Sequence, residues 1–379
     1  MSMLYFDYNA TTPLDPEVLD AMMPFLTEHY GNPSSLHSAG RMPAKGLREA
    51  RRDAAKLIGA LREEEIIFTS GGTESNTAAI RAALAASPDR KEIITSSVEH
   101  SSVLKLCREL AGQGYKVHEI GVDDQGRLET DMFFEVLSSK TALVALMLSN
   151  NETGVHFPLE VLGEKIHEAG AIYFVDAVQS AGKMEINAAR LGCDFLSLSS
   201  HKLYGPKGSG ILYHRKTAPF SALVWGGSQE RKRRGGTENV PGIVGTGKAC
   251  EIAAQHLSEE QKRLSTLRNQ FEKLIQNKIS GTCIHGIEAE RLVNTSNMAF
   301  EGIDAEALLA ALDQKEICVS SGSACMSGAG SPSHVIKAMG FPDAHARSTL
   351  RFSFGRFTKQ EEIEILISEL TSAVERIRG

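Results

Sequence analysis

The stretch LSLSSHKLYGPKGSG, residues 196–210, runs from an apolar strand into a polar, glycine-rich turn. Its first residues predict a buried strand, and Ser199, Ser200, His201 and Lys202 follow at the strand's end. Open α/β sheets bind ligands at this carboxyl edge, which makes the position suitable for a Schiff-base lysine. Taken alone, however, the segment is better interpreted as a solvated lysine at a strand end.

The surrounding sequence predicts an α/β fold with a mostly parallel, seven-stranded sheet covered by helices on both faces. Short apolar runs lie at 65–68, 92–95, 116–120, 142–148, 171–176, 195–199 and 210–214, and segments of helical period at 75–86, 103–113 and 159–169 lie between them. Such alternation is typical of strand, helix, strand units.

Beyond about residue 255 the pattern changes to that of a smaller α+β domain. A long polar helix is expected at 249–277 and another at 304–314. The last helix is expected to open with a capping box from Thr358 to Glu361, and its apolar stripe comprises Ile363, Leu366, Leu370, Val374 and Ile377. We therefore expect an N-terminal segment (1–15) packed on the small domain, a large domain (16–254) and a small C-terminal domain (255–379).

Composition limits the classes of function. The 379 residues are 42% hydrophobic and 23% charged, with a net charge of −6, which gives no electrostatic case for binding nucleic acid or an anionic membrane. No run of about 18 apolar residues is present, and the N-terminus lacks the apolar run of a signal peptide. We expect a cytoplasmic protein. Its six scattered cysteines show no metal-ligand spacing, so we expect reduced thiols that are mostly buried.

Two other strand ends carry residues that could bind a cofactor. FVDAVQS, 174–180, places Asp176 and Gln179 after a strand, and a carboxylate there can keep a pyridine nitrogen protonated. TSGGTESN, 69–76, combines two glycines with a helix start, which suits a phosphate. Each has an ordinary alternative: Asp176 as a helix cap or turn residue, and 69–76 as a simple strand-to-helix turn.

Further strand ends supply His100 in 97–103 and Asn150 and Asn151 in 149–154. A lone histidine is more often structural than catalytic. Because all these segments should meet at one edge of one sheet, their coincidence is much more specific than any single motif.

The last chemically informative segment is SSGSACMSGAGSPSH, 320–334, with Cys325 among small residues. Serine, glycine and alanine cannot bury a thiol, so we expect an exposed cysteine that is either incidental or a working nucleophile.

Together these motifs resemble the cysteine desulfurases, which are class V aminotransferase-like, fold type I pyridoxal-phosphate enzymes. The resemblance spans the chain, at 5–13, 30–40, 69–76, 97–103, 149–154, 175–180, 199–208, 233–242, 320–325 and 350–358. The SSGSAC sequence is similar to that of the first group, the nitrogen-fixation and housekeeping iron–sulfur type.

The resemblance implies a role for each matching residue. Lys202 would hold pyridoxal 5'-phosphate and move the substrate's α-proton, Asp176 would pair with the pyridine nitrogen, Gln179 with the ring hydroxyl, and His100 would stack on the ring. The phosphate would be held by Gly72, Thr73, Ser199, His201 and, from the second subunit of a homodimer, Thr237. Asn151 and Arg351 would bind the carboxylate of L-cysteine, and Cys325 would take its sulfur as a persulfide. A sulfur-acceptor or iron–sulfur scaffold protein is the implied partner, and no metal is implied.

Two departures concern the acceptor. The loop from Cys325 to Pro332 lacks the acidic residue expected near its end, and the sequence stops at Gly379 without the tail that housekeeping members use to dock a scaffold. The acceptor is therefore left open. Rival functions are selenocysteine lyase, another carbon–sulfur lyase, an aminotransferase, or a silent scaffold. Cys325 argues against an aminotransferase, and the intact set of Lys202, Asp176 and Cys325 argues against a scaffold.

Overall fold

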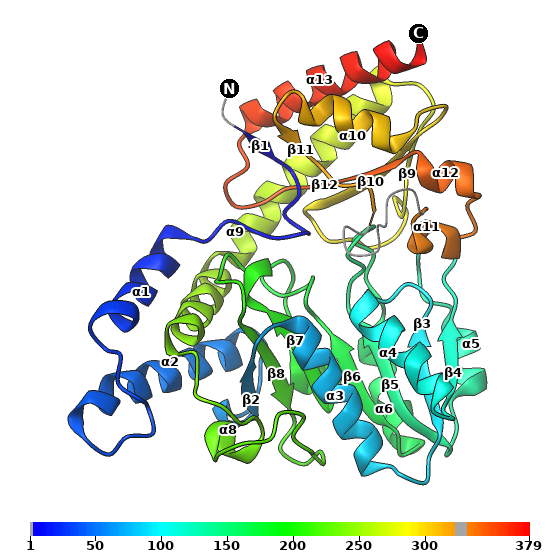
Figure 1. The fold of residues 1–379 in the computed structure, drawn as a ribbon. Helices are drawn as coiled ribbons and strands as arrows, with labels where there is room; N and C mark the ends of the chain where they lie inside the picture. The colour runs from blue at the N-terminus through cyan, green and yellow to red at the C-terminus, as the bar shows by residue number, and fades with distance from the viewer. Residues whose placement is uncertain (1–2, 323–331) are drawn as a thin grey trace.

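The computed structural model describes residues 3–322 and 332–379 and divides them between two packed units (Figure 1). The large unit is built on a seven-stranded sheet within the described residues, in the order β2-β8-β7-β6-β5-β3-β4. Its strands are β2 (Ile66–Thr69), β3 (Glu92–Ser96), β4 (Lys116–Ile120), β5 (Thr141–Met147), β6 (Ile172–Asp176), β7 (Phe195–Ser199) and β8 (Gly210–His214). Only β8 runs antiparallel to its neighbours, β2 and β7. The mostly parallel, seven-stranded sheet expected from the sequence is confirmed.

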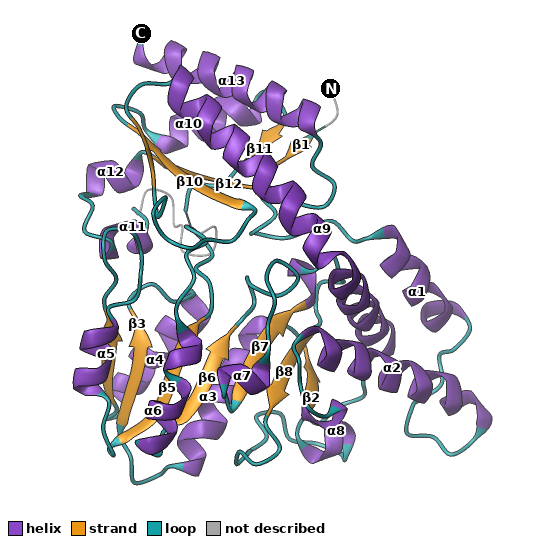
Figure 2. Cartoon of the chain, turned by 180° about the vertical axis from the view of Figure 1, so that it is seen from behind, coloured by secondary structure: helices purple, strands orange, loops and turns teal. Residues whose placement is uncertain are grey.

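Helices cover both faces of this sheet, because its strands are apolar on both sides. Neighbouring residues of one strand enter different cores: Phe174 packs with α3 (Gly72–Ala86) and α4 (Ser101–Gly112), whereas Val175 packs on the other face. That second face is covered by α2 (Arg41–Leu57), α6 (Gly163–Glu168), α7 (Ala188–Leu191) and the first part of α9 (Val240–Lys278), as Figures 1 and 2 show from opposite sides. The alternation of side chains along each strand thus produces three layers.

The C-terminal unit is an antiparallel sheet backed by helices. Strand β10 (Thr295–Phe300) lies between β9 (Thr282–Ile284) and β12 (Thr349–Ser353). α10 (Ala305–Asp313), α13 (Gln360–Arg378) and the end of α9 enclose a separate core that includes Phe271, Phe300 and Phe352. The N-terminal strand β1 (Leu4–Tyr5) pairs in parallel with β11 (Ile317–Cys318). The remaining helices are α1 (Pro16–Thr27), α5 (Thr130–Val136), α8 (Gln229–Lys232), α11 (His334–Ala338) and α12 (Asp343–Arg347).

The predicted helix at 249–277 begins nine residues earlier, at Val240, where the Asn239 side chain accepts a hydrogen bond from the Gly242 amide. Glycines in its first turns lower the helix propensity, and for this reason the sequence pattern did not predict this part of the helix. Tertiary packing explains them: a Cβ on Gly247 would lie 2.3 Å from the Cα of Ala50 in α2. Because α9 runs through both units, the boundary at 254/255 stays a prediction, as does the one at 15/16.

Two local predictions are wrong in detail. α13 is capped one residue later than expected and by only half of a capping box: the Lys359 amide donates to Glu362 (2.9 Å), while the Thr358 hydroxyl accepts from the Gly355 amide. The helix expected at 159–169 is a short 3₁₀ turn, Leu159–Val161, followed by α6. Helix ends depend on which polar group reaches the first free amides, and the sequence pattern does not resolve this.

Three of the five cysteines in the described residues are buried and all five are free thiols, as expected. Within residues 3–322 and 332–379, no helix combines the length and apolar character needed to cross a membrane.

Candidate active site

The carboxyl edge of the large sheet forms a hollow of about 190 Å³. Nine of the predicted site residues line it: Gly72, Thr73, His100, Asn151, Asp176, Gln179, Ser199, His201 and Lys202. They follow five different strands, which the topology brings to one edge. Three predicted residues are not among them: Thr237 is exposed elsewhere, Arg351 lies behind Asn151, and Cys325 lies outside the described residues.

Lys202 closes the 3₁₀ turn Ser200–Lys202 that follows β7. Its ammonium group donates to the backbone carbonyls of Asn9 and Ala10, the latter at 2.6 Å. Both carbonyls belong to the N-terminal segment that precedes α1. The segment therefore holds the lysine amine at the edge of the hollow, where an electrophile could meet it.

Asp176 is the last residue of β6 and is only 6% exposed. Its carboxylate accepts hydrogen bonds from the side chain of Asn76 (2.7 Å) and from the Val178 amide (3.0 Å). Asn76 also donates to the hydroxyl of Ser102 (2.8 Å), which contacts Nδ1 of His100 at 2.8 Å. A chain of hydrogen bonds therefore links the carboxylate to the imidazole and fixes both side chains.

His100 caps α4, and its Nδ1 accepts from the Ser102 amide at 3.2 Å. Burial lowers the pKa of this imidazole, the charges of Lys202 and His334 lower it further, and Asp176 opposes them. The ring is therefore neutral at pH 7, with its proton on Nε2 because Nδ1 is an acceptor. A neutral imidazole can accept a proton from a reacting group.

The start of α3 has the geometry that suits an anion. The first amides of a helix have no partner within it and carry partial positive charge. Here the helix begins at Gly72. A Cβ on Gly210 would lie 2.6 Å from the Cα of Gly71, so β8 can approach the turn before the helix this closely only because residue 210 is glycine. His201 faces the same hollow, and burial together with Lys202 and Lys207 lowers its pKa to about 4.

Two ionisable groups near the hollow were missed, of which Lys183 is half-buried and Glu99 is buried. Lys183 donates to Gln179 (3.0 Å) and to the Asn9 side chain (3.3 Å), and burial lowers its pKa well below the ordinary value. Glu99 is fully buried, and desolvation raises its pKa to about 8. Asn9 and Asn76 were also missed, although both lie in segments singled out from the sequence. Polar residues inside such segments were the available signal.

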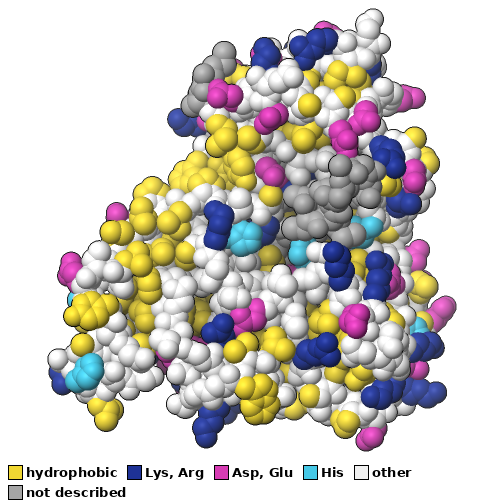
Figure 3. All heavy atoms as spheres, in the orientation of Figure 1, with side chains coloured by type: hydrophobic (Ala, Val, Ile, Leu, Met, Phe, Trp, Pro, Cys, Tyr) yellow, Lys and Arg dark blue, Asp and Glu magenta, His cyan; other side chains and the backbone are white. Residues whose placement is uncertain are grey.

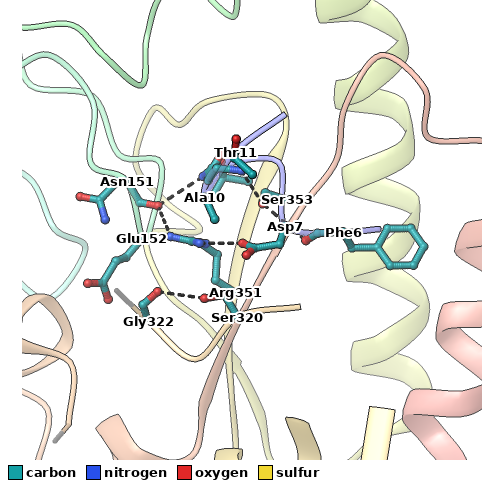
Figure 4. A network of polar contacts seen from close by, with 12 residues as sticks. Phe6, Asp7, Ala10, Thr11, Asn151, Glu152, Ser320, Gly322, Arg351 and Ser353 are labelled. Carbon is teal, nitrogen blue, oxygen red and sulfur yellow. Dashed lines mark hydrogen bonds and ion pairs between the residues drawn. The ribbon is translucent and has the colours of Figure 1, made fainter. Parts of the chain in front are cut away.

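Arg351 lies in β12 of the C-terminal unit and connects the two units. Its guanidinium donates to the Asn151 carbonyl (2.9 Å) and pairs with Asp7 (2.7 Å), as Figure 4 shows. Nε of Arg351 is buried and has no hydrogen-bond partner among the described residues. The arginine therefore stands next to the hollow with N–H groups that these two contacts do not use, although it does not line it.

The donor set fits pyridoxal phosphate. An amine can bind an aldehyde, a buried carboxylate can pair with a pyridine nitrogen, and a helix start with Thr73, Ser199 and His201 can hold a phosphate. These three features lie around a single hollow, at the ends of different strands. The residues present thus match the three functional parts of this cofactor.

Comparisons with known proteins agree with this geometry. The family model "Aminotransferase class-V" matches residues 4–366. A cysteine desulfurase from Cereibacter sphaeroides is 50% identical, with 100% of this chain and 97% of the relative covered. A solved "NIFS-like protein" is similar at a TM-score of 0.92 and 34% identity over 99% of this chain and 100% of its own. A structure described as "SspA in complex with cysteine" is similar at a TM-score of 0.82 and 33% identity. The match covers 94% of this chain and 100% of that one. The chain therefore belongs to the class-V aminotransferase family of pyridoxal-phosphate-dependent enzymes and, within it, to the NifS-like cysteine desulfurases.

Proposed function

We propose that this protein is a cysteine desulfurase that converts L-cysteine to L-alanine and leaves the sulfur on Cys325 as a persulfide. The observation that carries the proposal is the convergence of Lys202, Asp176 and His100 on one hollow. The structure described as "SspA in complex with cysteine", which is 33% identical to this chain, supports the choice of substrate.

When bound, pyridoxal phosphate supplies an electron sink that stabilises negative charge at the α-carbon of an amino acid. In our proposal Lys202 Nζ would hold the cofactor through its aldehyde carbon, and Asp176 would keep its pyridine nitrogen protonated. Gln179 would hold the ring hydroxyl, and His100 would face the ring. Gly72, Thr73, Ser199 and His201 would hold the phosphate.

The substrate is oriented by its carboxylate. We assign this contact to Arg351 and Asn151, since the arginine touches Asn151 and has an unpaired Nε. An arginine fork fixes the plane of a carboxylate as well as its position. Lys202 Nζ would take the proton from the α-carbon, and neutral His100 is available to accept the thiol proton of Cys325.

In the sulfur-transfer step, the thiolate of Cys325 attacks the substrate sulfur. A sulfur–sulfur bond forms, the bond from sulfur to Cβ breaks, and its electron pair stays with the carbon skeleton. The skeleton takes the proton held by His100 at Cβ, takes back the α-proton from Lys202 and leaves as alanine. Gly322 and Ser333, which flank the segment that contains Cys325, both lie against Glu152, the neighbour of Asn151. Cys325 is three residues from Gly322, a reach of roughly 10 Å.

We further propose a homodimer in which Thr237 reaches the phosphate site of the second subunit. Thr237 is exposed in one chain, and α1 presents an apolar face with Leu19, Met23 and Leu26 exposed, visible as a hydrophobic area in Figure 3. Such a face is typical of an interface. The sulfur then passes to an acceptor or iron–sulfur scaffold protein, and a cytoplasmic location stays a prediction.

The test is to record the absorbance of the purified protein with pyridoxal phosphate, add L-cysteine and assay alanine, in the wild type and in Cys325→Ala. Bound cofactor should give its own band, and alanine should form only with the wild type. Cys318→Ala is the matched control, because this second cysteine lies in β11, outside the hollow. Alanine formation that survives Cys325→Ala would remove the persulfide step, and the absence of a cofactor band would overturn the enzyme assignment.

A further inference from the structure

The C-terminal unit contains a second group of side chains with ligand chemistry. One ligand atom each of Cys283, His285 and His345 lies within 4.8 Å of the other two. Cys283 lies in β9 and His285 two residues later, so both face the same side of the strand, and His345 comes from α12. None of the three lines the hollow around Lys202.

The tautomer of His285 is determined by its neighbours. Asn297 in β10 is buried and donates its amide N–H to the Glu152 carbonyl (3.3 Å), so its carbonyl oxygen faces Nδ1 of His285 at 2.6 Å. Nδ1 must therefore carry the proton, which leaves a lone pair on Nε2. This nitrogen points at Nε2 of His345, 2.8 Å away. A metal-binding histidine usually has this arrangement, with its second nitrogen donating to a protein oxygen.

The cluster is also accessible. Cys283 and His345 line a surface hollow of about 700 Å³, which leaves room for an entering ion and for a water ligand. Glu301 and Asp304 line the same hollow and attract a cation, while Arg347 opposes them. Buried His285 forms the closed side of the group and the hollow forms its open side.

We propose that Cys283 Sγ, His285 Nε2 and His345 Nε2 bind one zinc ion, with water in the fourth position. Sulfur and imidazole nitrogen are the ligands that zinc prefers, whereas magnesium and calcium prefer oxygen. Two nitrogens bound to zinc at 2.0–2.1 Å in a tetrahedron lie roughly 3.4 Å apart, so the two rings must separate by roughly 0.6 Å. His345 is half-buried and lies in α12, a five-residue helix in which only Ala346 is buried, so most of the helix's surroundings are free to follow a movement of this size.

The experiment uses the full chain loaded with pyridoxal phosphate and carrying Cys325→Ser, so that this second thiol cannot bind metal. After removal of metals with a chelator, the protein is titrated with Co²⁺ and then with Zn²⁺. We expect one Co²⁺ per chain, with a sulfur-to-cobalt charge-transfer band and the strong d–d bands of tetrahedral cobalt. One equivalent of Zn²⁺ should abolish these bands. The readout is independent of desulfurase activity.

Cys283→Ser should abolish the charge-transfer band, and both this change and His345→Gln should weaken zinc binding more than about 10-fold. Cys318→Ser is the matched control, since Cys318 is also a half-buried strand cysteine of the same unit, and it should change neither property. Thermal unfolding of each variant checks the fold. Cobalt that binds without the charge-transfer band, a band that persists in Cys283→Ser, or no binding at micromolar metal would each overturn the proposal.

Discussion

The two halves of the active site are assembled differently. The cofactor half consists of side chains at the ends of neighbouring strands of one sheet, such as Lys202 after β7 and Asp176 in β6. The carboxylate half joins Arg351 of β12 to Asp7, 344 residues away, and to the Asn151 carbonyl of the large unit. The first half depends on the topology of one sheet, and the second on how the two units pack.

This difference predicts different responses to mutation. A change in the cofactor half should alter the cofactor's spectrum and the chemical step. A change at Arg351 or Asp7 in the carboxylate half should leave the spectrum intact and alter substrate binding, because neither residue lines the hollow around Lys202. Separate effects on KM and kcat distinguish the two halves.

The largest effect is expected for Lys202→Ala. Loss of the amine removes both the link to the cofactor and the group that moves the α-proton, so kcat should fall by roughly 10²–10⁴-fold or more. The absorbance spectrum of the bound cofactor should change as well. Lys207→Ala, which removes an exposed lysine five residues further on, should leave both properties unchanged. A normal spectrum in Lys202→Ala would contradict the assignment of this half.

Arg351→Lys should raise KM for L-cysteine by about 10–100-fold with little change in kcat, because an ammonium group cannot reproduce the bidentate contact. The spectrum without substrate should match that of the wild type. Arg356→Lys is the control: this arginine is also ion-paired at the junction, with Asp15 and Glu260, but does not touch Asn151. Equal effects of the two changes would mean that Arg351 has only a structural role.

Glu99→Gln tests the buried carboxyl group next to His100 of the cofactor half. Desolvation raises the pKa of Glu99 to about 8 in the folded protein, so the folded state holds a proton that the unfolded state has lost above about pH 4.5. The contribution of Glu99 to the free energy of unfolding is therefore fully present below the pKa that this group has in the unfolded state. It falls as the pH rises towards 8.

Between pH 6 and 8 the wild type should lose roughly 1–3 kcal/mol of unfolding free energy through this group, and Glu99→Gln should not. Denaturant unfolding at several pH values measures the slope. Glu119→Gln, on the outer strand next to Arg108, should leave the slope as in the wild type. An unchanged slope in Glu99→Gln would show that Glu99 is ionised in the folded protein.

The smallest effect is expected for Asp7→Asn. The amide keeps a hydrogen bond to Arg351 but loses the ion pair, so the guanidinium is held less firmly and KM should rise about 3–10-fold. Asp7 acts as a positioning residue, and kcat should stay constant. A fall in kcat at constant KM would place Asp7 in the chemical step and break the distinction between the two halves.

The sequence determined the α/β class, the seven strands and nine residues of the hollow, because parallel strands buried on both faces read as apolar runs and their carboxyl ends must share one edge. The roles of these residues came from the resemblance to a family, because the apolar pattern and the spacing of residues do not indicate them.

Only the tertiary structure decided which groups touch. The link from Asp176 through Asn76 to Ser102, the pairing of Arg351 with Asp7, and the cluster of Cys283, His285 and His345 all join segments distant in the chain. The unexpected start of α9 has the same origin, since its glycines make sense only against α2. Periodicity records which face of an element is buried, whereas partners across units depend on packing that no local pattern encodes.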